Sequence, residues 1–373
     1  IKLADQHPEL CADRLLVDHS PRFSAHHPEP PNYARLFMRE PLLILSALWG
    51  SSYLFIKLAL EDELSPALIV SVRTALAALV LLPLAAHRKT LGGLRANVAP
   101  ILLLAVVQMG GPLLLIAAGE QSISSSLTGI LVATAPIFTF LLAFAQEGQE
   151  RASGLSLGGV ALGIGGVTLL LGLDAGGGAA LGGGLMVVAA SFGYAVGGWV
   201  VKRQVRDVQP VAMVGATAAV AALLTAPAAL LSLPSHFPSF TASGSLIVLG
   251  VLCTGAAFVI FYSLVSSDGP ARASLVGYIA PGFSVVYGVT LLAESFAFTT
   301  ACGLVAITAG SWLAAEGRWP LGASLGPDWR GRARGLTSRP SEARCLPADS
   351  APEKSTQVIA LLPRLRRAAG VPG

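Results

Sequence analysis

The stretch PLLILSALWGSSYLFIKLAL, residues 41–60, decides the fold of this chain. Its one charged side chain, Lys57, lies close to its end. The hydrocarbon core of a bilayer is roughly 30 Å thick, and a helix of about 20 apolar residues crosses it. The stretch therefore predicts a transmembrane helix.

Further apolar runs of similar length follow along the 373 residues. Hydrophobic residues make up 53% of the chain and charged residues only 12%, and the mean hydropathy is +0.68. Soluble domains carry about 25% charged residues, so this chain has too few of them to cover a surface in water. We expect an all-α integral membrane protein with ten transmembrane helices, at roughly 41–60, 66–86, 98–118, 123–145, 154–173, 180–201, 210–232, 245–265, 270–293 and 298–316.

Lys and Arg residues occur in or beside alternate loops between these expected helices, and the remaining loops contain none. Because positively charged loops stay in the cytoplasm, the alternation predicts that both termini are cytoplasmic. We expect a multi-pass protein of the cell inner membrane. The residues that set the pattern are Arg88, Lys89, Arg95, Arg151, Lys202, Arg203, Arg206 and Arg272.

The two ends of the chain differ from the apolar middle. Residues 1–40 are polar, and we weigh two interpretations: a disordered cytoplasmic segment, or an over-extended start with Met38 as the natural first residue. Residues 317–373 are basic and predict a disordered cytoplasmic tail, although the apolar piece Val358–Leu362 could instead lie on the anionic inner leaflet. The formal net charge of +4 comes from the loops and this tail, so we expect no nucleic-acid partner. The four cysteines lack metal-type spacing, and we expect free thiols and no metal.

The chain repeats itself at an offset of 145 residues, which defines two five-helix repeats, residues 41–173 and 180–316. Because five is odd, the second repeat must enter the membrane from the opposite side, which makes this an inverted-topology repeat. Such repeats are a signature of transporters, whose two inverted halves expose a central site to either side in turn. The residues that pair at this offset include Ala135-Pro136 with Ala280-Pro281, Lys57 with Lys202, Gly110 with Gly255, Phe138 with Phe283, and Trp49 with the aromatic Tyr194.

Each repeat also carries a short motif. The first opens with Leu48-Trp49-Gly50-Ser51-Ser52, followed by Ile56-Lys57 and by Arg73. The second has Gly269-Pro270-Ala271-Arg272-Ala273-Ser274, then Ala280-Pro281 and Glu294. In this order and spacing, residues 43–316 resemble the EamA-type branch of the drug/metabolite transporter superfamily. The resemblance implies a ten-helix secondary transporter that exports a small metabolite, an amino acid or a drug. We expect no cofactor.

Polar side chains inside a bilayer are costly, so each is a candidate for function. Arg73 in the second expected helix could hold an anionic group with its planar guanidinium, or it could tie helices together or extend toward the membrane surface. Trp49, Gln108, Tyr194 and Tyr278 fall near the middle of the membrane and suit a mostly apolar cavity with a few polar groups. Ordinary helix packing is the alternative for each aromatic residue. We expect a substrate between the halves, in contact with some of these five residues.

A second group of residues are candidates for a hinge or a gate. Pro136 and Pro281 fall inside the fourth and ninth expected helices, where proline kinks the backbone, either as a hinge or as a static packing feature. Lys57 lies close to the outer membrane boundary and could gate, or could simply extend its ammonium group to water. Glu120 and Glu294 lie at the outer ends of the third and ninth helices, where they could gate or be ordinary solvated carboxylates.

Three other classes of membrane protein compete with a transporter. A membrane-embedded enzyme needs a Ser with a His, clustered Asp residues or paired carboxylates, and the expected spans contain no Asp or His. A channel would favour rings of polar residues, and a non-transporting scaffold would not need a proline in both halves. The transporter remains our interpretation, with the lipid bilayer and a small-molecule substrate as partners. A homodimer is a further candidate assembly.

Overall fold

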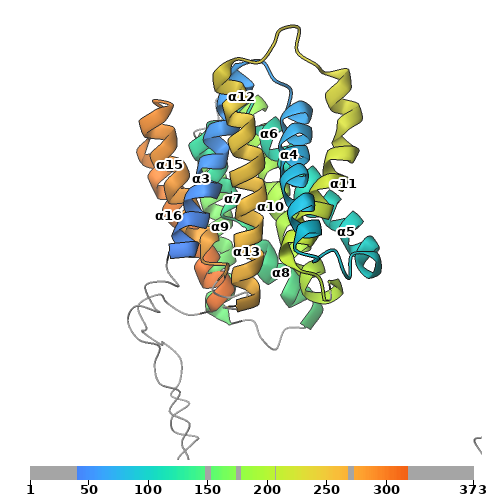
Figure 1. Cartoon of the computed structure of the whole chain (residues 1–373). Helices are drawn as coiled ribbons and strands as arrows, with labels where there is room; N and C mark the ends of the chain where they lie inside the picture. The colour runs from blue at the N-terminus through green and yellow to red at the C-terminus, as the bar shows by residue number, and fades with distance from the viewer. Residues whose placement is uncertain (1–39, 148–152, 174–177, 206, 268–272, 318–373) are drawn as a thin grey trace, which may run out of the picture. The chain divides into compact units, whose positions relative to one another are not determined.

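The computed structural model describes residues 40–147, 153–173, 178–205, 207–267 and 273–317, all within the compact unit Ile1–Ala323 (Figure 1). The predictions for residues 1–39 and for the basic tail fall outside these ranges, as do the loop arginines at 151, 206 and 272. Within the described ranges every regular element is helical. In chain order the elements are α3 (Glu40–Glu61), α4 (Pro66–His87), η1 (Arg95–Asn97), α5 (Val98–Leu104), η2 (Ala105–Gly110), α6 (Gly111–Gly119), α7 (Ser125–Val132), α8 (Ala135–Glu147), α9 (Gly154–Leu173), α10 (Gly178–Gln204), α11 (Pro210–Leu231), α12 (Phe240–Ile247), η4 (Val248–Ala256), α13 (Ala257–Ser267), α15 (Val276–Leu291) and α16 (Phe298–Glu316).

These elements correspond to the expected spans. In the described part of the chain, nine helical segments are long and apolar enough to cross a membrane, and α15, of 16 residues, is a shorter apolar helix. Residues 268–272, where the ninth expected helix begins, lie outside the described ranges. The structure thus agrees with an all-helical membrane protein of nine or ten spans, and the count of ten stays a prediction.

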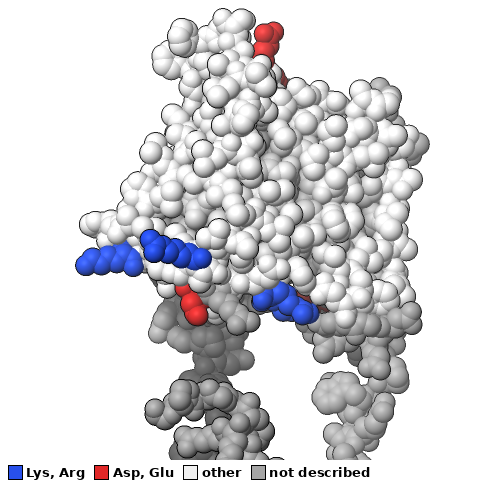
Figure 2. All heavy atoms as spheres, turned by 90° about the vertical axis from the view of Figure 1, so that its right-hand side faces the viewer, with Lys and Arg blue, Asp and Glu red and all other residues white. Residues whose placement is uncertain are grey.

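The bundle has two chemically different ends. The loop after α4 lies beside the loop after α10, because a Cβ atom built on Gly93 would be 2.6 Å from the carbonyl oxygen of Asp207. We call this the basic end; Figure 2 shows Lys and Arg side chains near it and a broad uncharged band above them. At the opposite end, Asp62 accepts a hydrogen bond from the Ser239 N–H at 2.9 Å. We call this the acidic end, after Glu61, Asp62 and Glu63.

The first helices of the two repeats run in opposite directions. Helix α3 begins at the basic end and ends at the acidic end (Figure 1). Helix α10 starts near Gly119, since a Cβ atom on Gly183 would be 2.7 Å from the Gly119 carbonyl oxygen, and it ends with Lys202 and Arg203. This is the arrangement that an odd number of spans per repeat predicts.

The packing partners also come in matched pairs. Helix α3 packs on α15 as α10 packs on α7 and α8, so the first span meets the ninth and the sixth meets the fourth. Helix α4 packs on η4 as α11 packs on η2, and the pairs α4–α11 and α9–α16 each join equivalent helices. Two halves related by a two-fold axis produce this pattern of contacts.

Helices α9 and α16 approach each other unusually closely. A Cβ atom on Gly159 would be 2.5 Å from the Ala314 nitrogen, and one on Gly310 would be 2.5 Å from the Gly163 nitrogen. Small residues permit such close backbone contact. Van der Waals packing of this kind holds helices together in a membrane, where the hydrophobic effect does not drive them to associate.

Candidate functional site

Arg73 is a deeply buried basic residue of the central bundle, with 2% of its surface exposed. Its Nε donates a hydrogen bond to the Thr254 hydroxyl at 3.0 Å, and its Nη2 donates to the Ser52 hydroxyl at 3.1 Å. Its third nitrogen, Nη1, has no hydrogen-bond partner among the described residues. Because Ser52 belongs to the first repeat and Thr254 to the second, the guanidinium joins the two halves.

Two π-helices interrupt the helical segments of the bundle, and one of them, η4, packs against α4, the helix that carries Arg73. Segment η4 carries Thr254, and segment η2 carries Gln108. The two segments occupy equivalent places, since positions 105–110 shifted by 145 fall within η4. π-Helical turns are rare overall and are frequent at functional sites. Each π-helical turn rotates the side chains that follow it. In η4 the turn includes Thr254, whose hydroxyl accepts a hydrogen bond from Arg73.

Other polar side chains surround the Arg73 guanidinium. Tyr53, Tyr194 and Cys253 all lie close enough to interact with its charge. The Ser51 hydroxyl lies 3.7 Å from the Cys253 sulfur. These residues come from α3, α10 and η4, so both repeats contribute to a small polar centre in an otherwise apolar core.

Lys57 connects this centre to the acidic end. Its ammonium group donates to the carbonyl oxygen of Glu120 at 3.0 Å and to that of Ile123 at 3.4 Å. The half-buried side chain therefore fixes the loop 120–124 between α6 and α7. The carboxyl group of Glu120 is also buried, with 0% exposure. The expected alternative of a solvated interface carboxylate is wrong for Glu120, because the loop turns this side chain inward.

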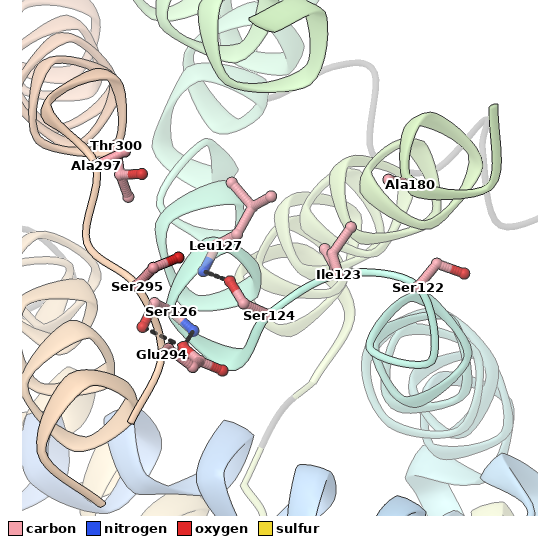
Figure 3. A pocket seen from close by; sticks show the side chains of 10 residues that line it. All are labelled: Ser122, Ile123, Ser124, Ser126, Leu127, Ala180, Glu294, Ser295, Ala297 and Thr300. Atoms are coloured by element: carbon pink, nitrogen blue, oxygen red, sulfur yellow. Dashed lines mark hydrogen bonds between the residues drawn. The ribbon is translucent and has the colours of Figure 1, made fainter. Parts of the chain in front are cut away.

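Glu294, which follows α15, contacts the start of α7. Its carboxylate accepts a hydrogen bond from the N–H group of Ser125 at 2.7 Å. It also accepts from the N–H group of Ser126 at 3.0 Å and from the Ser126 hydroxyl (Figure 3). The first N–H groups of a helix have no partner within the helix and carry a partial positive charge, so a carboxylate there is stabilising. The contact joins the two repeats at the acidic end.

A cavity of about 390 Å³ lies beside this contact. Its lining is rich in hydroxyl groups, and the side chains drawn in Figure 3 come from the 122–127 segment, from Ala180 of α10 and from the 294–300 segment. The polar residues among them are Ser122, Ser124, Ser126, Glu294, Ser295 and Thr300.

The other expected site residues have different surroundings. Trp49 packs against the rings of Phe258 and Phe261, at centroid distances of 5.6 and 5.2 Å. The Gln108 side chain is buried and accepts a hydrogen bond from the Tyr262 hydroxyl at 2.9 Å. Tyr278 lies against α16, where its hydroxyl donates to the Ser311 carbonyl oxygen at 3.4 Å. The structure therefore brings Arg73 and Tyr194 together and places Tyr278 in another helix contact.

The two expected hinge prolines differ in their local structure. Pro281 lies inside α15, whereas Pro136 is the second residue of α8 and follows an interruption at Ala133-Thr134. The expectation of a proline inside a continuous fourth helix is therefore corrected: the helix stops and restarts before it. Close contacts surround Pro281, because a Cβ atom on Gly50 would be 2.9 Å from the Ala280 carbonyl oxygen.

Sequence reasoning missed Ser52, Tyr53 and Thr254. A signal for them existed in the repeat itself, because the offset of 145 aligns Gln108 with Cys253 and Gly110 with Gly255, on either side of Thr254. Only the fold shows that this segment faces Arg73.

The fold and this site define a multi-pass membrane protein of two helical repeats with a buried polar centre between them. The model of the EamA-like transporter family matches residues 40–172 and 181–315, one match for each repeat. The chain belongs to the EamA-like transporter family, which confirms the resemblance seen in its motifs.

A solved structure is similar in fold. It is described only as "Crystal structure of protein", has a TM-score of 0.56 and 19% sequence identity, and covers 75% of this chain and 96% of its own. At this identity the likeness shows the fold alone. No curated protein matches the chain.

Proposed function

We propose that this protein is a secondary transporter that moves a small molecule with an anionic group across the membrane by alternating access, with Arg73 in contact with that group. The observation that carries the proposal is the Nη1 of Arg73, which is buried between the two repeats and has no hydrogen-bond partner in the described part of the chain. Export is the proposed direction, as the motif resemblance implies.

The physical argument starts from the cost of burying this cation. A buried N–H without an acceptor costs about 1–3 kcal/mol, and more when the donor is charged. Thr254 and Ser52 accept hydrogen bonds from two of the guanidinium nitrogens and fix its plane, which leaves the Nη1 N–H groups to donate to a carboxylate, phosphate or sulfonate group. Tyr194 and Gln108 stay candidate contacts for the remainder of the substrate. We leave Tyr278 out because of its place against α16.

The inverted repeat supports alternating access. The contacts at the acidic end, Glu294 with Ser125 and Ser126, join the repeats there, and the contact of Gln108 with Tyr262 joins them further along the bundle. Two halves with matched packing can exchange conformations, so that one set of contacts opens as the other forms. Pro136 of α8 and Pro281 of α15 are the proposed hinges.

The test begins with a thermal-stability screen of the purified full chain against small carboxylates, phosphates and sulfonates. A ligand that binds the folded state raises its apparent stability by mass action. Each hit is then measured for uptake into vesicles that contain the reconstituted protein. We expect uptake by the parent chain, uptake reduced about tenfold or more in Arg73→Lys, and still less in Arg73→Ala, since a charged hydrogen bond contributes about 1.5–3 kcal/mol.

Arg95→Lys is the matched control, because Arg95 is exposed at the basic end. Rates are expressed per monodisperse folded molecule, so that a purely structural role of Arg73 shows as lost protein and not as a lower rate. An Arg73→Ala protein with the parent rate per molecule would remove Arg73 from the substrate site.

A further inference from the structure

Glu120 is a buried acid that the proposed substrate site does not use. Its side chain is 0% exposed, and neither carboxyl oxygen has a hydrogen-bond partner among the described residues. It follows α6 in the loop 120–124, whose residues Ser122, Ile123 and Ser124 line the cavity at the acidic end. Glu120 itself is not part of that lining, so the loop presents hydroxyls to the cavity and a carboxyl group to the interior.

Two cations lie near Glu120, and both donate their hydrogen bonds elsewhere. Lys57 donates to the backbone carbonyl oxygens of Glu120 and Ile123, and Arg73 donates to hydroxyl groups. An ionised carboxylate would draw one of these donors to itself, because charge-assisted hydrogen bonds are roughly twice as strong as neutral ones. A neutral carboxyl group has no such pull, and the observed geometry is the one expected for it.

The balance of charges around Glu120 leads to the same result. Burial raises the pKa of Glu120 well above its usual range, Lys57 and Arg73 oppose that rise, and Glu294 adds to it. Tyr53 of α3 also lies within range of the carboxyl group. An isolated buried carboxylate is costly enough that the group normally takes up a proton instead.

We propose that Glu120 is the proton-binding site of this protein: it carries a proton while the acidic end is closed, and it releases that proton when the acidic end opens and water reaches the loop 120–124. Proton binding and closure of the acidic end are therefore coupled. The inference rests on the proposed function in one respect: under that function, the opening of the acidic end is a step of transport.

The coupling has a definite sign. In the open form water reaches Glu120 and its pKa returns to the ordinary range of a glutamate, whereas in the closed form burial holds the pKa well above that range. Below the open-form value both forms are protonated and the ratio of closed to open molecules does not change with pH. Between the two values the ratio falls about tenfold for each pH unit, and above the closed-form value it is constant again. Rising pH therefore opens the acidic end.

The test measures the exposure of the acidic end as a function of pH, with the proton as the only ligand. Ser125 is 1% exposed under Glu294, whereas Ser122 is exposed in the same loop region. Full-length Ser125→Cys and Ser122→Cys proteins in lipid nanodiscs are reacted with a maleimide from pH 5 to pH 8. The rate at Ser122→Cys corrects for the greater thiolate fraction at higher pH, and the parent chain gives the background from its native cysteines.

We expect the ratio of the two rates to rise with pH in the parent background, by up to about tenfold per unit. With Glu120→Gln, which mimics the neutral acid, the ratio should stay low and independent of pH. Glu120→Asp should retain the rise, and Glu61→Gln, an exposed acid at the same end, should leave the profile unchanged.

Three outcomes would overturn the inference. They are a flat profile in the parent background, an unchanged rise in Glu120→Gln, and a Glu120→Gln protein that does not fold, since a neutral isostere must be accepted where the carboxyl group is neutral. Because the assay contains no substrate, its failure leaves the Arg73 transport test standing. Conversely, if the protein showed no transport, the pH profile would still test the coupling between proton binding at Glu120 and closure of the acidic end.

Discussion

The carboxylate of Glu294 accepts the backbone N–H of Ser125 at 2.7 Å and so connects the end of α15 in one repeat to the start of α7 in the other. The Ser126 N–H adds a second bond at 3.0 Å to the other carboxylate oxygen. These are the N–H groups that α7 cannot satisfy internally, and Ser124 satisfies the next one, that of Leu127, at 3.1 Å. The start of α7 is thus completed partly by its own repeat and partly by the other.

The first prediction concerns this contact. Replacing Glu294 by Gln removes the negative charge at the α7 N-terminus and one of the two acceptor oxygens. We expect a loss of about 1–3 kcal/mol from the contact, and faster maleimide labelling of a Ser125→Cys reporter. Labelling rates in Glu294→Gln are compared with those in Glu61→Gln, which should match the parent. Equal rates in all three proteins would mean that Glu294 does not hold the acidic end closed.

The second prediction uses two neighbouring glycines of α9. A Cβ atom on Gly159 would contact the backbone of α16, whereas one on Gly158 would meet nothing within 4 Å. We expect Gly159→Ala to lower the thermal stability of the purified protein, since overpacking costs about 1–3 kcal/mol. Gly158→Ala should be neutral or slightly stabilising, because Ala is the better helix former. A scan in which Gly158→Ala loses as much as Gly159→Ala would contradict the close packing of α9 on α16.

The third prediction is the orientation in the membrane. Single cysteines in place of Lys89 and Lys202 lie at the basic end, and one in place of Glu63 lies at the acidic end. Because positive loops stay in the cytoplasm, an impermeant maleimide added to intact cells should label Glu63→Cys and spare the other two. The chain without an added cysteine gives the background. The proposed topology has both termini in the cytoplasm. Labelling of Lys89→Cys or Lys202→Cys from outside would contradict it and would require the opposite orientation or a different number of spans.

The fourth prediction concerns Pro281 as a hinge. Alanine at this position restores a backbone hydrogen bond donor inside α15 and favours a straight helix. We expect Pro281→Ala to lower the transport rate per folded molecule several-fold while its thermal stability is kept or raised. Pro83→Ala is the control, because Pro83 also lies inside a helix but is exposed. If both variants transport at the parent rate, the kink of α15 is a static packing feature.

The local sequence determined much of this protein. Apolar runs of about 20 residues are sufficient to predict membrane helices, since the length of each run and the thickness of the bilayer are the only quantities needed. The repeat at an offset of 145 and the motifs around Trp49 and Pro281 likewise predicted two related halves, and the family match over both repeats confirms the resemblance. The alternation of Lys and Arg also appears in the structure as a basic and an acidic end.

Tertiary structure alone decided which polar side chains meet. Hydropathy gives the depth of a residue in the membrane but not the direction in which its side chain points, and the π-helices η2 and η4 change that direction without a signal that periodicity can detect. Arg73 therefore could be named from the sequence, but its partners Ser52 and Thr254 could not. Glu120 is the clearest case: at the end of a helix its sequence position suggests a solvated carboxylate, and only the path of the loop 120–124, held by Lys57, turns it into a buried acid. The physical reason is that a loop's direction depends on contacts distant in sequence, which no local pattern contains.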